Sequence, residues 1–145
     1  MSLSTWQAYG WLVEHQPTAV EIRDLLALVE RDLADCEVEA LSPDWRLSIA
    51  YNAALQAALT ALTASGFRPA RESHHYRAIQ SLAFTIGSPS SLISRLDLFR
   101  KKRNQGGYER AGAVSEQEAN EMRILAREIV DQVRRWLAKN HLNLL

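Results

Sequence analysis

Residues 47–64, LSIAYNAALQAALTALTA, decide the fold because this long stretch contains no charged side chain. Ser42 and Pro43 precede it as an N-cap and a first helical residue, and Gly66 follows as a stop signal. Such a run raises the question of a membrane span, but alanine outnumbers leucine in it and Ser, Asn, Gln and Thr interrupt it. The sequence therefore predicts a buried central helix between Pro43 and Gly66.

Polar residues share one edge of this helix. Asn52, Gln56, Thr60 and Thr63 follow the spacing i, i+4, i+8 and i+11. A solvated face would normally carry Lys or Glu, so uncharged hydrogen-bonding groups indicate contact with a second protomer or with a polar cleft. Asn52 and Gln56 are accordingly candidates for a dimer interface or a cleft lining. The alternative is a weakly polar surface on an alanine-rich helix.

A capped amphipathic helix precedes the central one. Thr18, with Glu21 three residues later, has the spacing of a capping box, and apolar residues continue on or near one face until about Cys36. Residues 1–16 are rich in aromatic side chains but are interrupted by Gly10. We expect them to form an extension that packs on the bundle.

Three further helical segments are predicted after the central helix. Residues 71–86 lead to a stop at Gly87, residues 92–103 form a basic helix, and a second capping box opens a last helix over residues 116–139. No segment alternates with the period of a strand. The sequence therefore predicts one all-α domain over residues 1–145, an up-and-down bundle of four main helices plus one or two short ones.

Composition restricts the function classes. Seventeen basic and seventeen acidic residues cancel, so only a local patch could direct the chain to nucleic acid, and no membrane partner is expected. Cys36 is the only cysteine, which excludes a disulfide within the chain, and the first residues lack a secretory signal, so a cytoplasmic location is expected. Cys36 has no metal-ligand spacing around it and is read as an inert helix residue.

The local patch lies on the basic helix. Leu92, Leu96 and Phe99 follow the spacing i, i+4 and i+7, and the next position on that line is Arg103. An arginine thus occupies a position where the pattern calls for a core residue. We expect its side chain to point back toward the bundle where the helix ends.

Four consecutive cations, Arg100 to Arg103, end this helix and are followed by Asn104, two glycines and Tyr108. Arginine offers paired donors matched to phosphate oxygens, and glycines let backbone N–H groups approach an anion closely. The alternative is that a basic last turn complements the helix dipole, worth about 0.3–1 kcal/mol per charge. That alternative accounts for Lys101 and Lys102 but not for Arg103 on the apolar line.

Two adjacent histidines, His74 and His75, stand near the start of the preceding helix beside a tyrosine. Neighbouring residues on a helix diverge by about 100°, and neither histidine has a partner at i+3 or i+4 that would complete a zinc site. No metal site and no cofactor are therefore predicted. We expect one histidine to cap or pack and the other to contact a phosphate.

These residues resemble the HEPN domains of prokaryotes, whose signature is Arg, usually Asn, and then a His a few residues beyond. Arg103-Asn104 ends a basic helix in an all-α bundle, and the likeness extends over about residues 40–138 through YNAALQAALTAL, GFRP, HHYRAIQSL, LDLFRKKRN and VSEQEA. The resemblance implies a HEPN-like homodimer in which two Arg motifs share a cleft. Many members of the family are metal-independent ribonucleases of toxin–antitoxin or defence systems. Others are noncatalytic and bind nucleotides, nucleic acids or a nucleotidyltransferase.

The sequence departs from the family pattern at Tyr108, which stands five residues after Arg103 where the histidine is expected. In the family mechanism Arg103 would stabilise charge on the phosphorus and the histidine would assist the 2′-hydroxyl or the leaving oxygen. Tyrosine, with an ordinary pKa of about 10 against about 6.5 for histidine, is a poor base at neutral pH but can donate a hydrogen bond. His74 or His75 could replace the missing imidazole if either folds toward Arg103.

Three functional hypotheses follow. The first is a dimeric ribonuclease or RNA-binding toxin with Arg103 and Tyr108 as catalytic residues, and with Asn104, Lys102, Arg100, His74 and His75 as binding residues. The second is a noncatalytic HEPN module that binds a nucleotide, an RNA, an antitoxin or a nucleotidyltransferase through the same cleft. The third is a plain helical interaction domain in which a carboxylate holds Arg103.

Overall fold

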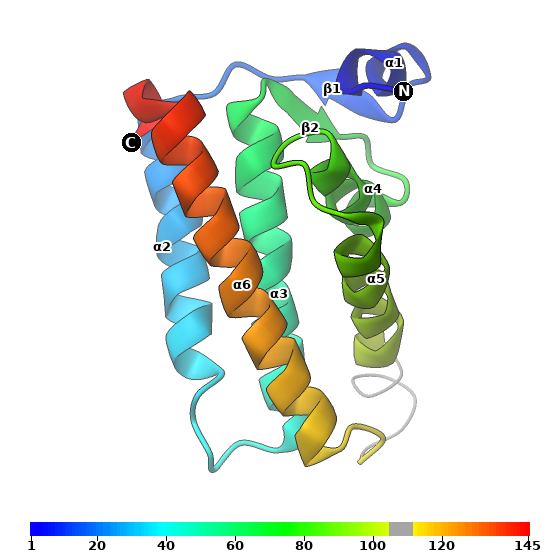
Figure 1. Cartoon of the computed structure of the whole chain (residues 1–145), viewed down its shortest axis with the longest axis vertical. Coiled ribbons are helices and arrows are strands. Elements are labelled where there is room, and N and C mark those ends of the chain that lie inside the picture. The colour runs from blue at the N-terminus through cyan, green and yellow to red at the C-terminus, as the bar shows by residue number, and fades with distance from the viewer. Residues whose placement is uncertain (105–111) are drawn as a thin grey trace.

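The computed structural model describes residues 1–104 and 112–145 and contains four long helices and two short ones within them. The helices are α1 (Leu3–Ala8), α2 (Ala19–Asp35), α3 (Pro43–Ala64), α4 (His74–Gln80), α5 (Ser90–Asn104) and α6 (Glu116–Asn140). Single 3₁₀ turns follow at Ser81–Ala83 and Leu142–Leu144. The long helices α2, α3, α5 and α6 alternate in direction along the chain (Figure 1). The predicted all-α class is confirmed.

Helix α3 occupies the centre of the bundle, as the sequence predicted. It packs chiefly against α6 and α2, and its alanine-rich faces let both neighbours approach closely. By length and composition α3 could cross a membrane, but 72% of its most apolar window is buried inside the protein. That burial is typical of the core helix of a soluble protein, because the apolar surface of α3 is already covered by its neighbours.

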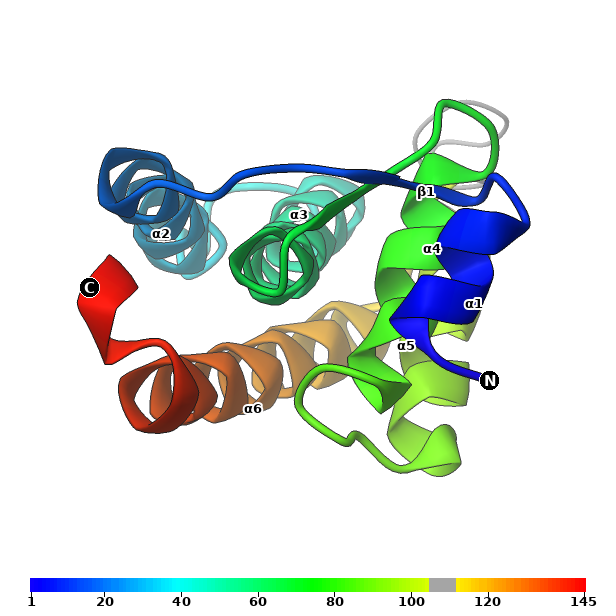
Figure 2. The same cartoon turned by 90° about the horizontal axis from the view of Figure 1, so that it is seen from above.

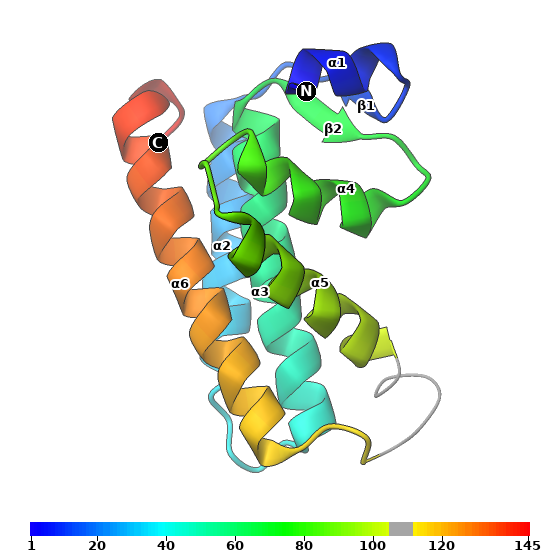
Figure 3. The same ribbon diagram turned by 45° about the vertical axis from the view of Figure 1, so that its right-hand side comes forward.

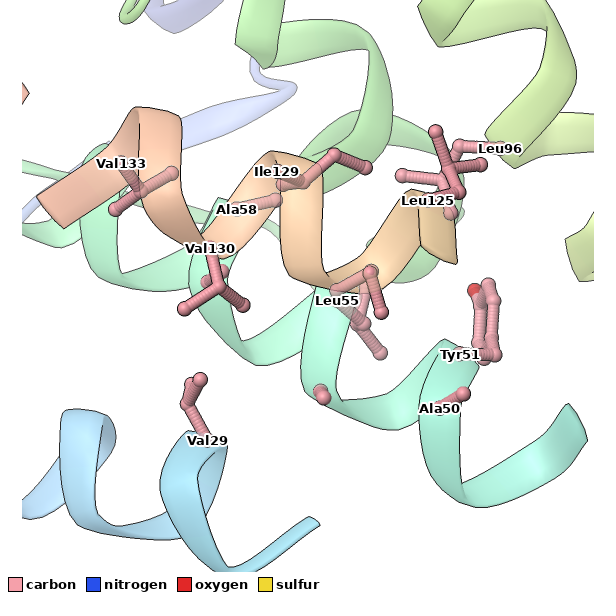
Figure 4. Close-up of a cluster of buried hydrophobic side chains, with 14 of the residues drawn as sticks. Val29, Ala50, Tyr51, Leu55, Ala58, Leu96, Leu125, Ile129, Val130 and Val133 are labelled. Carbon is pink, nitrogen blue, oxygen red and sulfur yellow. The ribbon is translucent and has the colours of Figure 1, made fainter. Parts of the chain in front are cut away.

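The main core forms where α3 meets α2, α5 and α6. Figure 4 shows Val29 of α2, Leu96 of α5 and Leu125 of α6 in one cluster with α3, where each is buried. Full burial of a side chain such as Leu125 is worth about 1.5–3 kcal/mol relative to exposure, so this cluster is the main source of the bundle's stability. Tyr51 belongs to the same cluster and is the largest side chain that is fully buried.

Two short strands, which the sequence pattern did not predict, correct the expectation of a purely helical chain. Strand β1 (Leu12–Glu14) pairs antiparallel with β2 (Phe67–Pro69), which directly follows the end of α3. The strands attach the N-terminal segment to the end of α3. Below them, Trp6 and Leu12 are buried with Leu62 of α3 in a second apolar cluster.

Capping chemistry explains where the helices begin. Ser115 and Glu118 form the predicted reciprocal capping box at α6. At α2 only half of the predicted box forms, because Thr18 accepts from the backbone N–H of Glu21 whereas the Glu21 carboxylate bonds Nε2 of His15, 2.6 Å away. The second interaction joins the N-terminal segment to α2.

Helices α4 and α5 lie on one side of the bundle. Seen along the bundle, α2, α3 and α6 form a triangle, and α4 and α5 lie on the far side of α3 from α2 (Figure 2). The chain reverses between α4 and α5, so the first turn of α4 and the last turn of α5 end up on the same side (Figure 3). The predicted site residues of both helices are therefore neighbours.

Candidate anion-binding site

Arg103 lies on the apolar line of α5 and turns toward the central helix. Leu92 and Leu96 on that line are buried and Phe99 packs against the core. One turn further on, the Arg103 guanidinium carbon lies 5.5 Å from the centroid of the Tyr51 ring. Arg103 is half-buried, and a cation at this distance over an aromatic face is attracted by the ring. The apolar face of α5 thus ends at Arg103, whose guanidinium group lies against Tyr51 of α3.

Tyr51 joins α3 to the start of α4. Its hydroxyl group lies 3.3 Å from Nδ1 of His75, and the two ring centroids are 6.1 Å apart. Burial raises the pKa of Tyr51 to about 12, although the charges of Arg103 and Arg100 oppose the rise. The phenol therefore keeps its proton at neutral pH and is available as a hydrogen-bond donor.

His75 is a neutral, half-buried imidazole. Burial is the main cause that lowers its pKa, and the positive charges of Arg103, His74 and Arg100 lower it further. A buried phenol needs an acceptor, and among the described residues Nδ1 of His75 is the acceptor that Tyr51 finds. From this bond we assign the tautomer of His75 that carries hydrogen on Nε2. That N–H is then a neutral donor suited to an anion.

His74 has different surroundings although its ring centroid lies 5.9 Å from that of His75. It is exposed and lines a pocket of about 310 Å³ together with Glu21, Thr63 and Arg68. Within residues 1–104 and 112–145, no group of three or more His, Cys, Asp or Glu side chains could hold a metal ion. The two histidines thus lie near each other but have different neighbours.

The three cations that directly precede Arg103 are paired with carboxylates, whereas Arg95, an exposed residue earlier in α5, has no carboxylate partner among the described residues. Arg100 donates from Nε to Asp97, 2.7 Å away, and this bond raises its pKa. Lys101 lies 3.8 Å from the same carboxylate, and Lys102 lies 3.3 Å from Glu118 at the start of α6. No carboxylate in the described part of the chain pairs with Arg103. Among the cations of the last turn, Arg103 is therefore the one best placed to receive an external anion.

Tyr76 of α4 lies beside Arg100. Its ring centroid lies 5.7 Å from the Arg100 guanidinium carbon, and its side chain is partly exposed. We call Tyr51, His75, Tyr76, Arg100 and Arg103 the Arg103 cluster. It brings together residues of α3, α4 and α5. Each half-buried guanidinium lies beside an aromatic ring and so keeps a fixed orientation for an incoming anion.

The remaining predicted residues lie elsewhere. Asn104 is exposed at the end of α5, and Tyr108 lies outside the described residues. Asn52 faces α2, where its side-chain N–H donates to Asp32, 2.6 Å away. Gln56 is half-buried, and its backbone oxygen accepts from the Thr60 hydroxyl. Asn52 and Gln56 are thus on α3 but are not brought together with the Arg103 cluster.

Sequence reasoning did not select Tyr51 as a site residue. It stands in the charge-free run and fits the apolar pattern of the core. The usable signal was its hydroxyl group, because a buried tyrosine needs a hydrogen-bond partner from a neighbouring element. His75 supplies that partner.

Comparison of the chain with protein-family models, curated proteins and solved structures finds no match. The chemistry of the Arg103 cluster therefore has to be interpreted from its own residues.

Proposed function

We propose that this chain is a HEPN-like protein that binds a phosphate group of RNA at the Arg103 cluster. The observation that carries the proposal is a half-buried guanidinium, Arg103, held against the ring of Tyr51 and without a carboxylate partner among the described residues. A buried cation needs an anion to offset its desolvation. A phosphate oxygen matches the forked N–H donors of arginine.

The groups around Arg103 favour the binding of an anion. His75 offers a neutral N–H, and Arg100 adds a second guanidinium whose charge is partly offset by Asp97. A neutral donor beside two arginines avoids the repulsion that a charged imidazole would add. The resulting combination can hold a phosphodiester at neutral pH.

RNA cleavage without a metal is the second candidate function, because the Arg103 guanidinium that would stabilise a phosphorane and the His75 imidazole both lie beside the Tyr51 ring, and the His74 ring neighbours that of His75. The 2′-oxygen would bond to phosphorus while the bond from phosphorus to the 5′-oxygen breaks, giving a 2′,3′-cyclic phosphate and a 5′-hydroxyl. His75 has its Nε2 proton in place and acts as a donor to the phosphate. His74 would then accept the 2′-hydroxyl proton, and water would protonate the leaving oxygen.

The biological setting proposed for this activity rests on the HEPN resemblance. It is a cytoplasmic homodimer that serves as the RNA-binding or ribonuclease component of a toxin–antitoxin or defence system. An antitoxin or a nucleotidyltransferase would be its protein partner. Sedimentation of the purified chain over a range of concentrations tests the dimer, and a purely monomeric protein contradicts it.

The experiment that tests the proposed function is RNA binding by fluorescence anisotropy, with gel analysis of the same samples in the presence of a chelator. Arg103→Ala is compared with Arg135→Ala, which removes an exposed arginine of α6 outside the cluster. Salt-sensitive binding that Arg103→Ala weakens about tenfold and Arg135→Ala leaves unchanged supports the proposal. Cleavage that depends on Arg103 and His74 supports the catalytic form.

Other results overturn the proposal. Binding of free nucleotides but not of RNA identifies a nucleotide-binding module instead. If Arg103→Ala lowers the melting temperature while RNA binding of the wild type is undetectable, the chain is a helical interaction domain in which the arginine is structural.

A further inference from the structure

A series of alternating aromatic rings and guanidinium groups runs from the N-terminal segment to α5. The Tyr9 and Trp11 ring centroids are 4.9 Å apart, and the Arg77 guanidinium carbon lies 3.6 Å from the Trp11 centroid. The same Arg77 carbon lies 5.4 Å from the Tyr76 ring, and Arg100 follows on Tyr76 at 5.7 Å. We call Tyr9, Trp11, Arg77, Tyr76 and Arg100 the aromatic–arginine track. It ends in the Arg103 cluster, with which it shares Tyr76 and Arg100.

The track is held in place by buried structure beneath it. Trp6 is buried and packs edge-on against Trp11 and against Phe84 of the turn after α4. Strand β1 pairs with β2 directly after Trp11. The Trp11 ring of the track is therefore preorganised, which lowers the entropic cost of binding a ligand beside it.

Packing of the core explains the position of Arg77 in the track but not the exposed rings of Tyr9 and Tyr76. Arg77 is half-buried, and its stacking on Trp11 is explained by attachment of the N-terminal segment to α4. Tyr9 and Tyr76, however, are 55% and 37% exposed. Neither ring is needed to fill a core, and both flank guanidinium or aromatic groups at the surface.

Charge along the track is positive. Arg77 has no carboxylate partner among residues 1–104 and 112–145, and Arg103 has none there either. Asp97 offsets part of the charge of Arg100 and Lys101. Exposed aromatic rings beside guanidinium groups are the arrangement by which proteins bind single-stranded nucleic acid, because bases stack on the rings and phosphates contact the cations.

We propose that a single strand of RNA continues from the Arg103 cluster along the aromatic–arginine track, with one base stacked on Tyr76 and a further base on Tyr9. This inference rests on the proposed function and adds the substrate class, single-stranded RNA, and a second binding surface on the N-terminal segment. A duplex is excluded from the track because its bases are already stacked on one another and present no free face.

The test uses anisotropy with a fluorescent RNA of about eight nucleotides, the length range of one single-strand binding module. Tyr76→Ala and Tyr9→Ala are each expected to weaken binding about tenfold, the loss that corresponds to one stacked base. Tyr76→Phe is expected to bind like the wild type because phenylalanine keeps the ring. Trp45→Ala is the matched control, since Trp45 is 64% exposed on α3 and outside the track.

Tryptophan fluorescence gives an independent readout. RNA bound along the track is expected to quench Trp11, so quenching is smaller in Trp11→Phe than in the wild type or in Trp45→Phe. Circular dichroism confirms that each variant is folded. A single-stranded DNA of the same sequence that also binds and quenches supports stacking on the track, and weaker binding of that DNA assigns a role to the 2′-hydroxyl.

The outcomes separate the two proposals. If Tyr76→Ala and Tyr9→Ala bind as the wild type does while Arg103→Ala binds about tenfold more weakly, the track is overturned and phosphate binding at Arg103 stands. A duplex that binds as tightly as the single strand also overturns the track. If the folded wild type binds neither the single-stranded RNA nor the duplex, both proposals are wrong.

Discussion

The hydroxyl group of Tyr51 lies 3.3 Å from Nδ1 of His75, so a fully buried ring of the core contacts an imidazole of the candidate site. A donor on the phenol places the hydrogen of the neutral imidazole on Nε2. With its hydrogen on Nε2, His75 can donate a hydrogen bond from Nε2 to an anion. The same Nε2 atom then cannot act as a base. The stability of the core and the chemistry of the surface are thereby linked through one bond.

Replacing Tyr51 with phenylalanine is expected to break this link with little change in shape. The loss of one hydrogen bond lowers the free energy of unfolding by about 1 kcal/mol. Nitrogen chemical shifts of the His75 ring are expected to change from a single Nε2–H tautomer to a mixture. A variant that retains the single tautomer contradicts the assignment.

Folding stability is expected to depend on pH through His75. Above pH of about 6.5 the ring is neutral in the folded and in the unfolded chain, so it makes no pH-dependent contribution. Below that value the unfolded chain takes up the proton first, because the folded pKa is lowered, and stability is lost until the folded pKa is passed. The decrease in melting temperature between about pH 7 and 5 is therefore expected to be smaller in His75→Gln than in the wild type. Parallel curves contradict the lowered pKa.

Substitutions of Arg103 are expected to change the salt dependence of RNA binding. Removal of one phosphate contact by Arg103→Ala weakens binding about tenfold and reduces the slope of log K against log salt by about 0.7 for a single strand. Arg103→Lys keeps the charge but loses the forked donors, so it retains the slope while affinity falls. A slope that Arg103→Ala leaves unchanged places the phosphate contact elsewhere.

Asn52 is expected to act on stability through Asp32. The Asp32 carboxylate is buried and accepts from Asn52 at 2.6 Å and from Arg31 at 3.1 Å. Asn52→Ala removes one donor and is expected to lower the free energy of unfolding by about 1–3 kcal/mol. Gln56→Ala, one turn later on α3, is the control and is expected to stay within about 0.5 kcal/mol of the wild type. Urea denaturation of the three proteins gives both values.

Much of the fold follows from local signals in the sequence. Ser42-Pro43 and Gly66 predicted the limits of α3, and the capping box at Ser115 predicted the start of α6. The strands were missed because Leu12–Glu14 and Phe67–Pro69 are too short to show an alternating pattern. Their pairing depends on contacts between segments far apart in the chain, which a local pattern does not contain.

The candidate site could be predicted only in part. The apolar line of α5 singled out Arg103 and predicted that it turns inward, because helical spacing fixes the direction of a side chain. Its neighbours Tyr51 and His75 depend on how α4 crosses α3, and the spacing within one helix carries no such information. Asn52 and Gln56 share the spacing of a cleft edge, yet Asn52 contacts Asp32 of α2.

Contacts on both sides of residues 105–111 have a consequence for the start of α6. Lys102 pairs with Glu118, a member of the α6 capping box, and Asp44 of α3 accepts from the backbone N–H groups of Gly112 and Val114. The chain is thus fastened to the bundle before and after that interval. Asp44→Ala removes the acceptor of both backbone N–H groups and is therefore expected to loosen the segment that leads into α6 without altering the Lys102–Glu118 pair at the end of α5.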